Sequence, residues 1–199
     1  MTGPPTASSR RGRTAAASRE DVLAAAMNRY LHGERIDVQA IATELGLGRT
    51  TIYRWFGSRE ELIGEVLAAA ADPLIDAARS GARGRGGQAL LDTFDRLNRS
   101  LADAPALRQF VEQERDAALR IITAGAGVVQ QHMVDRVSAL IQAEVRAGAY
   151  EPPVEPATLA YAIVRLAEAF LFNDAAAGMR GDVDRLRDVE AAILGVQAP

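Results

Sequence analysis

Apolar residues recur every three or four positions from residue 18 almost to the end of the chain. Val22 and Ala26 belong to an early stripe of this kind, and Leu90, Phe94 and Leu97 belong to a later one. One face of an α-helix has this period, whereas a half-buried β-strand alternates with a period of two. No segment shows convincing alternation, and no internal repeat is evident. The predicted fold class is therefore all-α.

Composition excludes several classes of function. The 199 residues are 48% hydrophobic and include no cysteine, so a core is possible but a disulfide or a thiolate metal site is not. The two histidines, His32 and His132, lie far apart in the sequence and offer little for a zinc site or a Ser-His-Asp relay. We therefore expect no metal, no cofactor and no enzymatic activity.

The sequence also bears on cellular location. The longest stretch without a charged residue, residues 121–134, is too short and too polar to span a bilayer. The N-terminal segment has no apolar core of the kind that a secretory signal requires. We therefore expect a cytoplasmic protein that does not associate with membranes.

The N-terminal end carries positive charge that the net charge of -3 conceals. Residues 1–17 contain Arg10, Arg11 and Arg13, no acidic residue and no apolar periodicity, which predicts a mobile basic arm. An arm of this charge suits a polyanionic partner, and an ordinary solvated tail is the alternative.

Two very short helices joined by a tight turn are predicted in residues 37–55. Asp37 is expected to cap the first helix, and Gly46 to end it. A further helix is predicted to begin with a capping box at Ser58 and to run to about Ala71. The two short helices have the form of a helix-turn-helix unit.

The second short helix carries side chains that a purely structural helix seldom needs. Ile52 and Phe56 can pack inward. Its other faces carry Arg49, Thr50, Thr51, Tyr53 and Arg54. Arginine binds guanine or phosphate, threonine reads base edges, and a tyrosine hydroxyl donates to phosphate. The pattern favours DNA binding, and a structural helix pair with a polar outer face is the alternative.

Four short motifs follow one another in residues 41–62. They are Ile41-Ala42, Gly46-Leu47, Tyr53-Arg54-Trp55-Phe56 and Ser58-Arg59-Glu60-Glu61-Leu62. Together they resemble the DNA-binding domain of the TetR family of bacterial transcriptional regulators, and the resemblance covers about residues 18–70. The sequence departs from the family pattern at Gly48, where a capping serine is common, and at Arg59, which replaces a lysine.

The resemblance implies an Ω-shaped homodimer of helical subunits, with a helix-turn-helix DNA-binding domain in residues 18–65 and a ligand-binding and dimerisation domain in residues 66–199. The residues that it implies for contact with bases or backbone are Thr50, Thr51, Tyr53 and Arg54, with Arg49 and Arg59 nearby. The arm arginines, Arg10, Arg11 and Arg13, would enter the minor groove or lie along phosphates. A dimer of this kind is expected to read a palindromic operator, with recognition helices about 34 Å apart or a multiple of that distance.

The segment from residue 156 to 174 is apolar on nearly every side. A helix of this kind must be covered all round, so one face requires a surface beyond its own core. This segment and a last helix in residues 183–197 are predicted to form the dimer interface. Two helices from each subunit would make a four-helix bundle around a two-fold axis.

An effector pocket is expected among the helices of the C-terminal part. The predicted walls are Leu97, Leu101, Phe110, Leu119, Met133, Ile163 and Phe172, and the predicted polar anchors are Glu114, His132 and Asn173. Such a site needs a few placed polar groups in an apolar cavity, and each apolar residue could equally be plain core. The phrase LAEAFLFNDA resembles TetR-family regulators of quorum-signal and lactone breakdown, which implies a lactone or fatty-acyl effector.

Together these features predict a ligand-responsive repressor that binds operator DNA as a dimer and is released by a small apolar molecule. A helical interaction module or a small-molecule-binding protein without DNA binding is the alternative, and it would require the motifs of residues 45–62 to be coincidental. An enzyme would require a nucleophile, base or metal cluster at suitable spacing, which the sequence does not offer.

Overall fold

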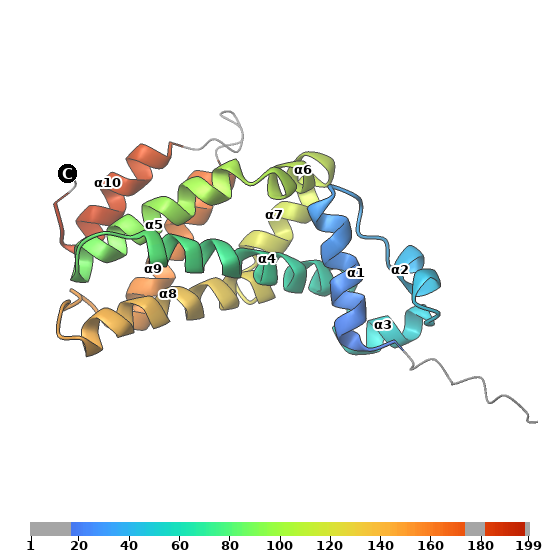
Figure 1. The fold of residues 1–199 in the computed structure, drawn as a ribbon. Helices are drawn as coiled ribbons and strands as arrows, with labels where there is room; N and C mark the ends of the chain where they lie inside the picture. Colours follow the sequence, from blue (N-terminus) through green and yellow to red (C-terminus); the bar gives the residue numbers. More distant parts are fainter. Residues whose placement is uncertain (1–16, 174–181, 198–199) are drawn as a thin grey trace, which may run out of the picture.

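The computed structural model describes residues 17–173 and 182–197, and these residues form helices and no strands (Figure 1). The helices are α1 (Arg19–Leu31), α2 (Val38–Glu44), α3 (Arg49–Phe56), α4 (Arg59–Gly81), α5 (Gly86–Asp103), α6 (Pro105–Gln113), α7 (Arg115–Thr123), α8 (Val128–Arg146), α9 (Pro156–Glu168), a π-helical turn η1 (Ala169–Asn173) and α10 (Val183–Leu194). The all-α prediction is confirmed.

Helices α1–α3 form a head at one end of the molecule, and α4 runs from this head into a longer body built from α5, α8, α9 and α10 (Figure 1). Helices α6 and α7 pack where the head meets the body, because α6 contacts α1 and α7 contacts α4. The helices of the described residues are all too short or too polar to traverse a bilayer.

Local capping explains where the head helices begin. At α1, Ser18 and Asp21 form the reciprocal capping box, in which each side chain accepts from the other residue's backbone N–H. At α2, Asp37 accepts from two backbone N–H groups. At α4 only half of the predicted box forms, because the Ser58 hydroxyl accepts from the Glu61 N–H while the Ser58 N–H donates to a carbonyl in α3.

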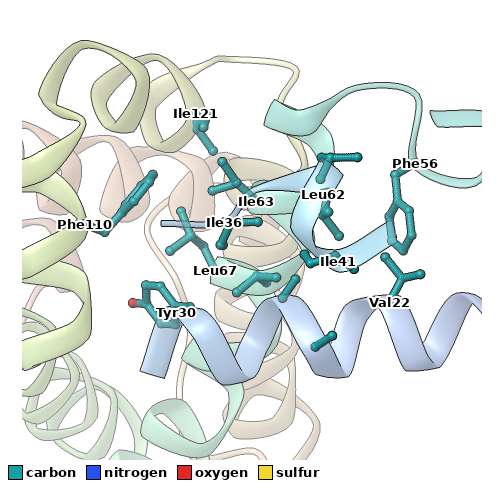
Figure 2. Close-up of a cluster of buried hydrophobic side chains, with 14 of the residues drawn as sticks. Val22, Tyr30, Ile36, Ile41, Phe56, Leu62, Ile63, Leu67, Phe110 and Ile121 are labelled. Carbon is teal, nitrogen blue, oxygen red and sulfur yellow. The ribbon is translucent and has the colours of Figure 1, made fainter. Parts of the chain in front are cut away.

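The core of the head is not closed by the head alone. Val22, Ile41 and Phe56 belong to one buried cluster with Phe110 of α6 and Ile121 of α7, and Figure 2 shows this cluster. The head therefore shares its apolar core with the two helices at the junction, and part of its stability comes from the body.

Helix α4 is longer than the sequence pattern predicted. It continues past Ala71, through Pro73, to Gly81. A proline inside a helix removes one backbone hydrogen bond, but Ile75 and Ala78 beyond it are buried against Leu97 of α5. Tertiary packing thus maintains the helix where local propensity predicts its end. The expected boundary between residues 65 and 66 lies inside this uninterrupted helix.

The body has its own core between α5, α8, α9 and α10. Leu91, Ile141, Ile163 and Leu194 contribute one side chain from each of these helices, and all are buried. After α9, the chain widens into the π-helical turn η1, which places the buried Leu171 beside the partly buried Phe172. Single π-turns of this kind occur frequently at binding sites.

Candidate nucleic-acid interface and ligand cavity

Helix α3 is fixed in place by its apolar face and by the turn before it. Ile52 and Phe56 are almost fully buried in the core of the head. Gly46 has a φ of 65°, in the left-handed region, and this lets the Leu47 N–H donate to the Ala42 carbonyl over 2.8 Å. The start of α3 has no side-chain cap, because Gly48 stands there.

The opposite face of α3 is open to solvent. Arg49, Thr50, Tyr53 and Arg54 are exposed, and Thr51 is partly buried. None of these five side chains forms a hydrogen bond or ion pair with any other residue in the part of the chain that the structure describes. Their donors are therefore available for an external partner, as phosphate and base contacts require.

Arg59 occupies a different environment from the α3 residues. Its guanidinium donates to both carboxylate oxygens of Glu114, at 2.8 and 2.6 Å, and its Nε donates to the carbonyl of Ile36 at 2.8 Å. In this conformation the side chain joins the head to the α6–α7 junction rather than pointing to solvent. Arg59 also holds the pKa of Glu114 below its usual range, chiefly by hydrogen bonding and against the opposing effect of burial.

The arm arginines, Arg10, Arg11 and Arg13, lie outside the described residues. Arg19, at the start of α1, pairs with Glu65 at 2.5 Å and lies over the ring of Phe56, with its guanidinium carbon 4.4 Å from the ring centre. This arginine stabilises the junction between α1, α3 and α4.

A cavity of about 90 Å³ lies in the body, and its wall is mainly apolar. Five of the predicted ligand-binding residues line it, namely Leu97, Leu101, Met133, Ile163 and Phe172. Four residues of the wall, Tyr30, Leu67, Leu107 and Ile122, also belong to the buried core that the head shares with α6 and α7. The cavity therefore reaches up to the core of the head.

The other predicted pocket residues lie elsewhere. Glu114 pairs with Arg59, and His132 contacts Asp72 of α4 at 2.9 Å. Phe110 packs edge-on against Tyr30, with ring centres 6.5 Å apart, on the head side of the cavity wall. Leu119 is partly buried on α7 and does not line the cavity. The side chain of Asn173 lies outside the described residues.

The polar groups of the cavity wall are Tyr30, Asn98, Glu168 and Glu190. Burial raises the pKa of Tyr30 to about 12, so its hydroxyl remains a neutral donor. Glu168 is 7% exposed and pairs with Arg165 at 2.7 Å. Burial raises the pKa of Glu168 against the opposing effect of this arginine.

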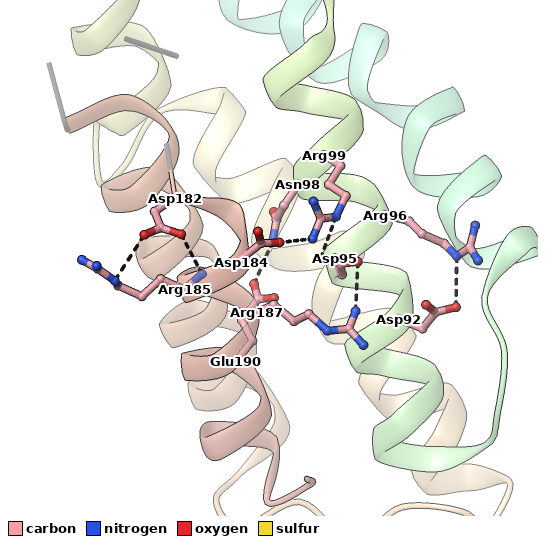
Figure 3. Close-up of polar contacts among 10 residues, drawn as sticks. All are labelled: Asp92, Asp95, Arg96, Asn98, Arg99, Asp182, Asp184, Arg185, Arg187 and Glu190. Carbon is pink, nitrogen blue, oxygen red and sulfur yellow. Dashed lines mark hydrogen bonds and ion pairs between the residues drawn. The ribbon is translucent and has the colours of Figure 1, made fainter. Parts of the chain in front are cut away.

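Glu190 of α10 is fully buried, with an exposed fraction of 0%. Its Oε1 accepts from the Asn98 side-chain amide at 3.0 Å, and Figure 3 shows this contact bridging α10 and α5. Burial raises the pKa of Glu190 to about 7, and nearby Asp95 adds to the shift whereas Asn98 and Arg187 oppose it.

Sequence reasoning missed these polar groups, although a signal for them was present. Glu190 stands midway between Leu186 and Leu194, at helical spacing within an apolar stripe, and Asn98 follows Phe94 by four residues in another. A polar residue on the buried face of a helix needs a partner, so such a position indicates either a buried network or a ligand contact.

Comparison with known proteins identifies the fold. Residues 85–195 match the protein-family model described as "Tetracyclin repressor-like, C-terminal domain". The structure of the TetR-family transcriptional repressor QsdR from R. erythropolis is similar with a TM-score of 0.85 and 30% sequence identity, over 91% of this chain and 96% of that chain. The TetR-family repressor AlkX from Dietzia sp. strain DQ12-45-1b, with a TM-score of 0.60, 19% identity and coverage of 90% and 94%, shares the fold. A comparison with curated proteins gives no match.

The family match covers more than half of the chain, and the similarity to QsdR extends over both the head and the body. The resemblance inferred from the motifs of residues 41–62 is thereby confirmed. The chain belongs to the TetR family of transcriptional regulators.

Proposed function

We propose that this protein is a dimeric, ligand-responsive repressor that binds a palindromic operator through α3. The observation that carries the proposal is the exposed polar face of α3, which is held outward by the buried side chains of Ile52 and Phe56. By contrast, the head arginines Arg19 and Arg29 pair with glutamates of the same chain. QsdR and AlkX are both described as repressors. A regulator of this kind does not need catalytic groups.

In this proposal α3 enters the major groove. Thr50, Thr51, Tyr53 and Arg54 contact bases or backbone, and Arg49 contacts a neighbouring phosphate. The arm arginines lie along phosphates or in the minor groove, and they strengthen binding without selecting a sequence. Arg59 serves instead to hold the head against the body, since both of its guanidinium ends are bound to Glu114.

The dimer interface is proposed on α9 and α10, which lie side by side in the body (Figure 1). Tyr161 of α9 is 50% exposed, and Val154 just before this helix is 48% exposed, although both are large apolar residues. A second copy related by a two-fold axis would cover them in a four-helix arrangement. Residues 66–199 would then form the ligand-binding and dimerisation domain, and residues 18–65 the DNA-binding domain.

The effector is proposed to be a small, largely apolar molecule that enters the cavity, with lactone and fatty-acyl compounds as candidate classes. The cavity reaches the core of the head through Tyr30, Leu67, Leu107 and Ile122. An occupant that repacks these side chains would favour a head position that no longer fits successive major grooves. Such coupling requires different affinities for the two states, typically about 1–3 kcal/mol.

The test begins with selection of bound genomic fragments and continues with a fluorescence-anisotropy titration of the selected operator. Tyr53→Ala is expected to weaken operator binding by about 1–3 kcal/mol, because it removes one contact of the recognition helix and breaks no hydrogen bond within the described residues. Arg54→Ala should act similarly, and Arg146→Ala, an exposed arginine at the end of α8, is the matched control.

If Tyr53→Ala and Arg54→Ala bound the operator as tightly as the Arg146→Ala control, α3 would not be the recognition helix. If no genomic fragment were retained at low ionic strength, the protein would act as a helical interaction module or small-molecule-binding protein instead.

A further inference from the structure

The charge of the cavity wall is one-sided. Two carboxylates, Glu168 and Glu190, line it together with Asn98 and Tyr30, and none of the described residues that line it is basic. A low-dielectric cavity amplifies the effect of such groups on whatever enters it. When these carboxyl groups are ionised they repel an anionic head group, and Asn98 and Tyr30 are the neutral donors of the wall.

Glu190 differs from Glu168 in how its carboxylate is satisfied. Arg165 donates to Oε2 of Glu168, at 2.7 Å. In Glu190, Asn98 donates to Oε1, whereas Oε2 is buried and has no hydrogen-bond partner within the described residues. A buried acceptor without a donor is costly, so native proteins retain one where a bound molecule or a function compensates for it.

The charged groups around Glu190 do not supply the missing donor. Arg187, on the same helix, pairs with Asp95 of α5 at 2.9 Å, and Arg99 pairs with Asp95 and Asp184, as Figure 3 shows. Both arginines therefore pair with Asp95 or Asp184, and neither donates to Glu190. Glu190 thus lines the cavity wall, and no side chain of the described residues donates to its Oε2.

We propose that Glu190 is the polar anchor of the effector, and that the effector is an apolar molecule whose head group donates a hydrogen bond to Oε2. The donor is a hydroxyl, an amide N–H or an ammonium group. Above the raised pKa of Glu190, a free carboxylate or phosphate is disfavoured as the deep-lying group, because it would lie beside an ionised carboxylate. This inference rests on the proposed function, because it concerns the same cavity.

Among lactone and fatty-acyl compounds, this anchor favours those whose head group carries a hydrogen-bond donor. A fatty acid would place its carboxylate beside two acceptors of the same charge, whereas an acyl chain ending in an amide or alcohol would place a donor there. Asn98 would remain on Oε1 in either case, so the orientation of the Glu190 carboxylate is preset for the incoming donor.

The experiment uses three eight-carbon probes that differ only in the head group, namely 1-octylamine, 1-octanol and octanoate. Their binding to the full-length protein is measured by isothermal titration calorimetry at pH 8, above the raised pKa of Glu190, which is about 7. The amine and the alcohol should bind more tightly than octanoate. Glu190→Gln, which retains the acceptor for Asn98 but presents an N–H to the cavity, should weaken amine binding at least about tenfold.

Glu168→Gln is the matched control. It also removes a buried carboxylate from the wall, but one whose Oε2 is already paired with Arg165. Its effect on amine binding should be smaller than that of Glu190→Gln. Should Glu190→Gln fail to fold, the wild-type protein provides the second measurement, in which amine affinity rises between pH 6 and pH 8 as the Glu190 carboxyl ionises.

Three results would overturn the inference. They are octanoate binding as tightly as octylamine, equal amine affinity in wild type and Glu190→Gln, and no binding of any probe to the wild-type protein. Operator binding is measured on the same protein preparations, so that a failure of the anchor can be distinguished from a failure of the proposed function. If the operator is bound but the donor preference is missing, only the anchor is wrong. If the donor preference is present without operator binding, the repressor assignment fails and the cavity chemistry stands.

Discussion

The buried carboxylate of Glu190 makes a measurable contribution to how stability depends on pH. Its pKa rises from 4.5 to about 7 on folding. At about 1.4 kcal/mol for each pH unit, this difference corresponds to about 3 kcal/mol. Because the folded state holds the proton more tightly, the group disfavours folding once the pH exceeds 4.5, and the full cost is reached above the folded-state pKa of about 7.

The perturbation that isolates this contribution is Glu190→Gln, because glutamine does not titrate. The free energy of unfolding is measured by urea denaturation at pH 5 and pH 8, at one protein concentration. Relative to the wild-type protein, the variant should gain most of the about 3 kcal/mol between these two pH values. In thermal scans this corresponds to about 2–4 °C for each kcal/mol in a chain of this size.

Glu151→Gln provides the control, since it removes an exposed glutamate from the loop before α9. Its difference from wild type should be the same at both pH values. The reasoning is refuted if the wild-type and Glu190→Gln stabilities change in parallel between pH 5 and pH 8, since the carboxyl would then titrate alike in the folded and unfolded chains.

Two further changes test the junction and the proposed dimer. Glu114→Gln removes the ionised partner of Arg59 and should lower the free energy of unfolding by about 1–3 kcal/mol at pH 7. Because the pKa of this carboxyl is lowered in the folded state, the loss of stability should shrink as the pH falls below 4.5. An equal loss at pH 7 and below pH 4.5, measured by urea denaturation, would contradict this prediction. Tyr161→Glu places a charge on the exposed apolar side of α9 and should convert the dimer to a helical monomer in analytical ultracentrifugation; an unchanged sedimentation coefficient would rule out this interface.

The head could be predicted from the sequence because its signals are local. Ser18 and Asp37 cap helices through residues two or three positions away, and Gly46 ends α2 by its own backbone conformation. The inward and outward faces of α3 follow from the spacing of Ile52 and Phe56. Each of these features requires only a few consecutive residues, so periodicity and capping rules suffice.

The cavity was only half predicted, because its wall depends on which helices meet. Periodicity identifies the buried face of a helix but not the neighbour that this face meets, so core and cavity residues look alike in the sequence. The predicted polar anchors Glu114 and His132 lie outside the cavity wall for the same reason. Glu114 pairs with Arg59, which is 55 positions away in the sequence, and His132 contacts Asp72, which is 60 positions away. Neither partner could be inferred from local spacing.

Helix α4 illustrates a third kind of difference. Pro73 gives a local signal for a helix end, and the prediction stopped just before it. The residues that continue the helix, Ile75 and Ala78, are buried by contacts with α5, which the local pattern does not contain. Where packing and propensity conflict, packing decides in this chain.

The wall that the cavity shares with the head has a thermodynamic consequence. Tyr30, Leu67, Leu107 and Ile122 belong both to the buried core that holds the head and to the wall of the cavity. Thermodynamic linkage is reciprocal. If an effector in the cavity lowers the affinity for operator DNA by some factor, then bound operator DNA must lower the affinity for the effector by the same factor. In the proposed mechanism these four side chains would couple the cavity to the head directly, through one set of van der Waals contacts.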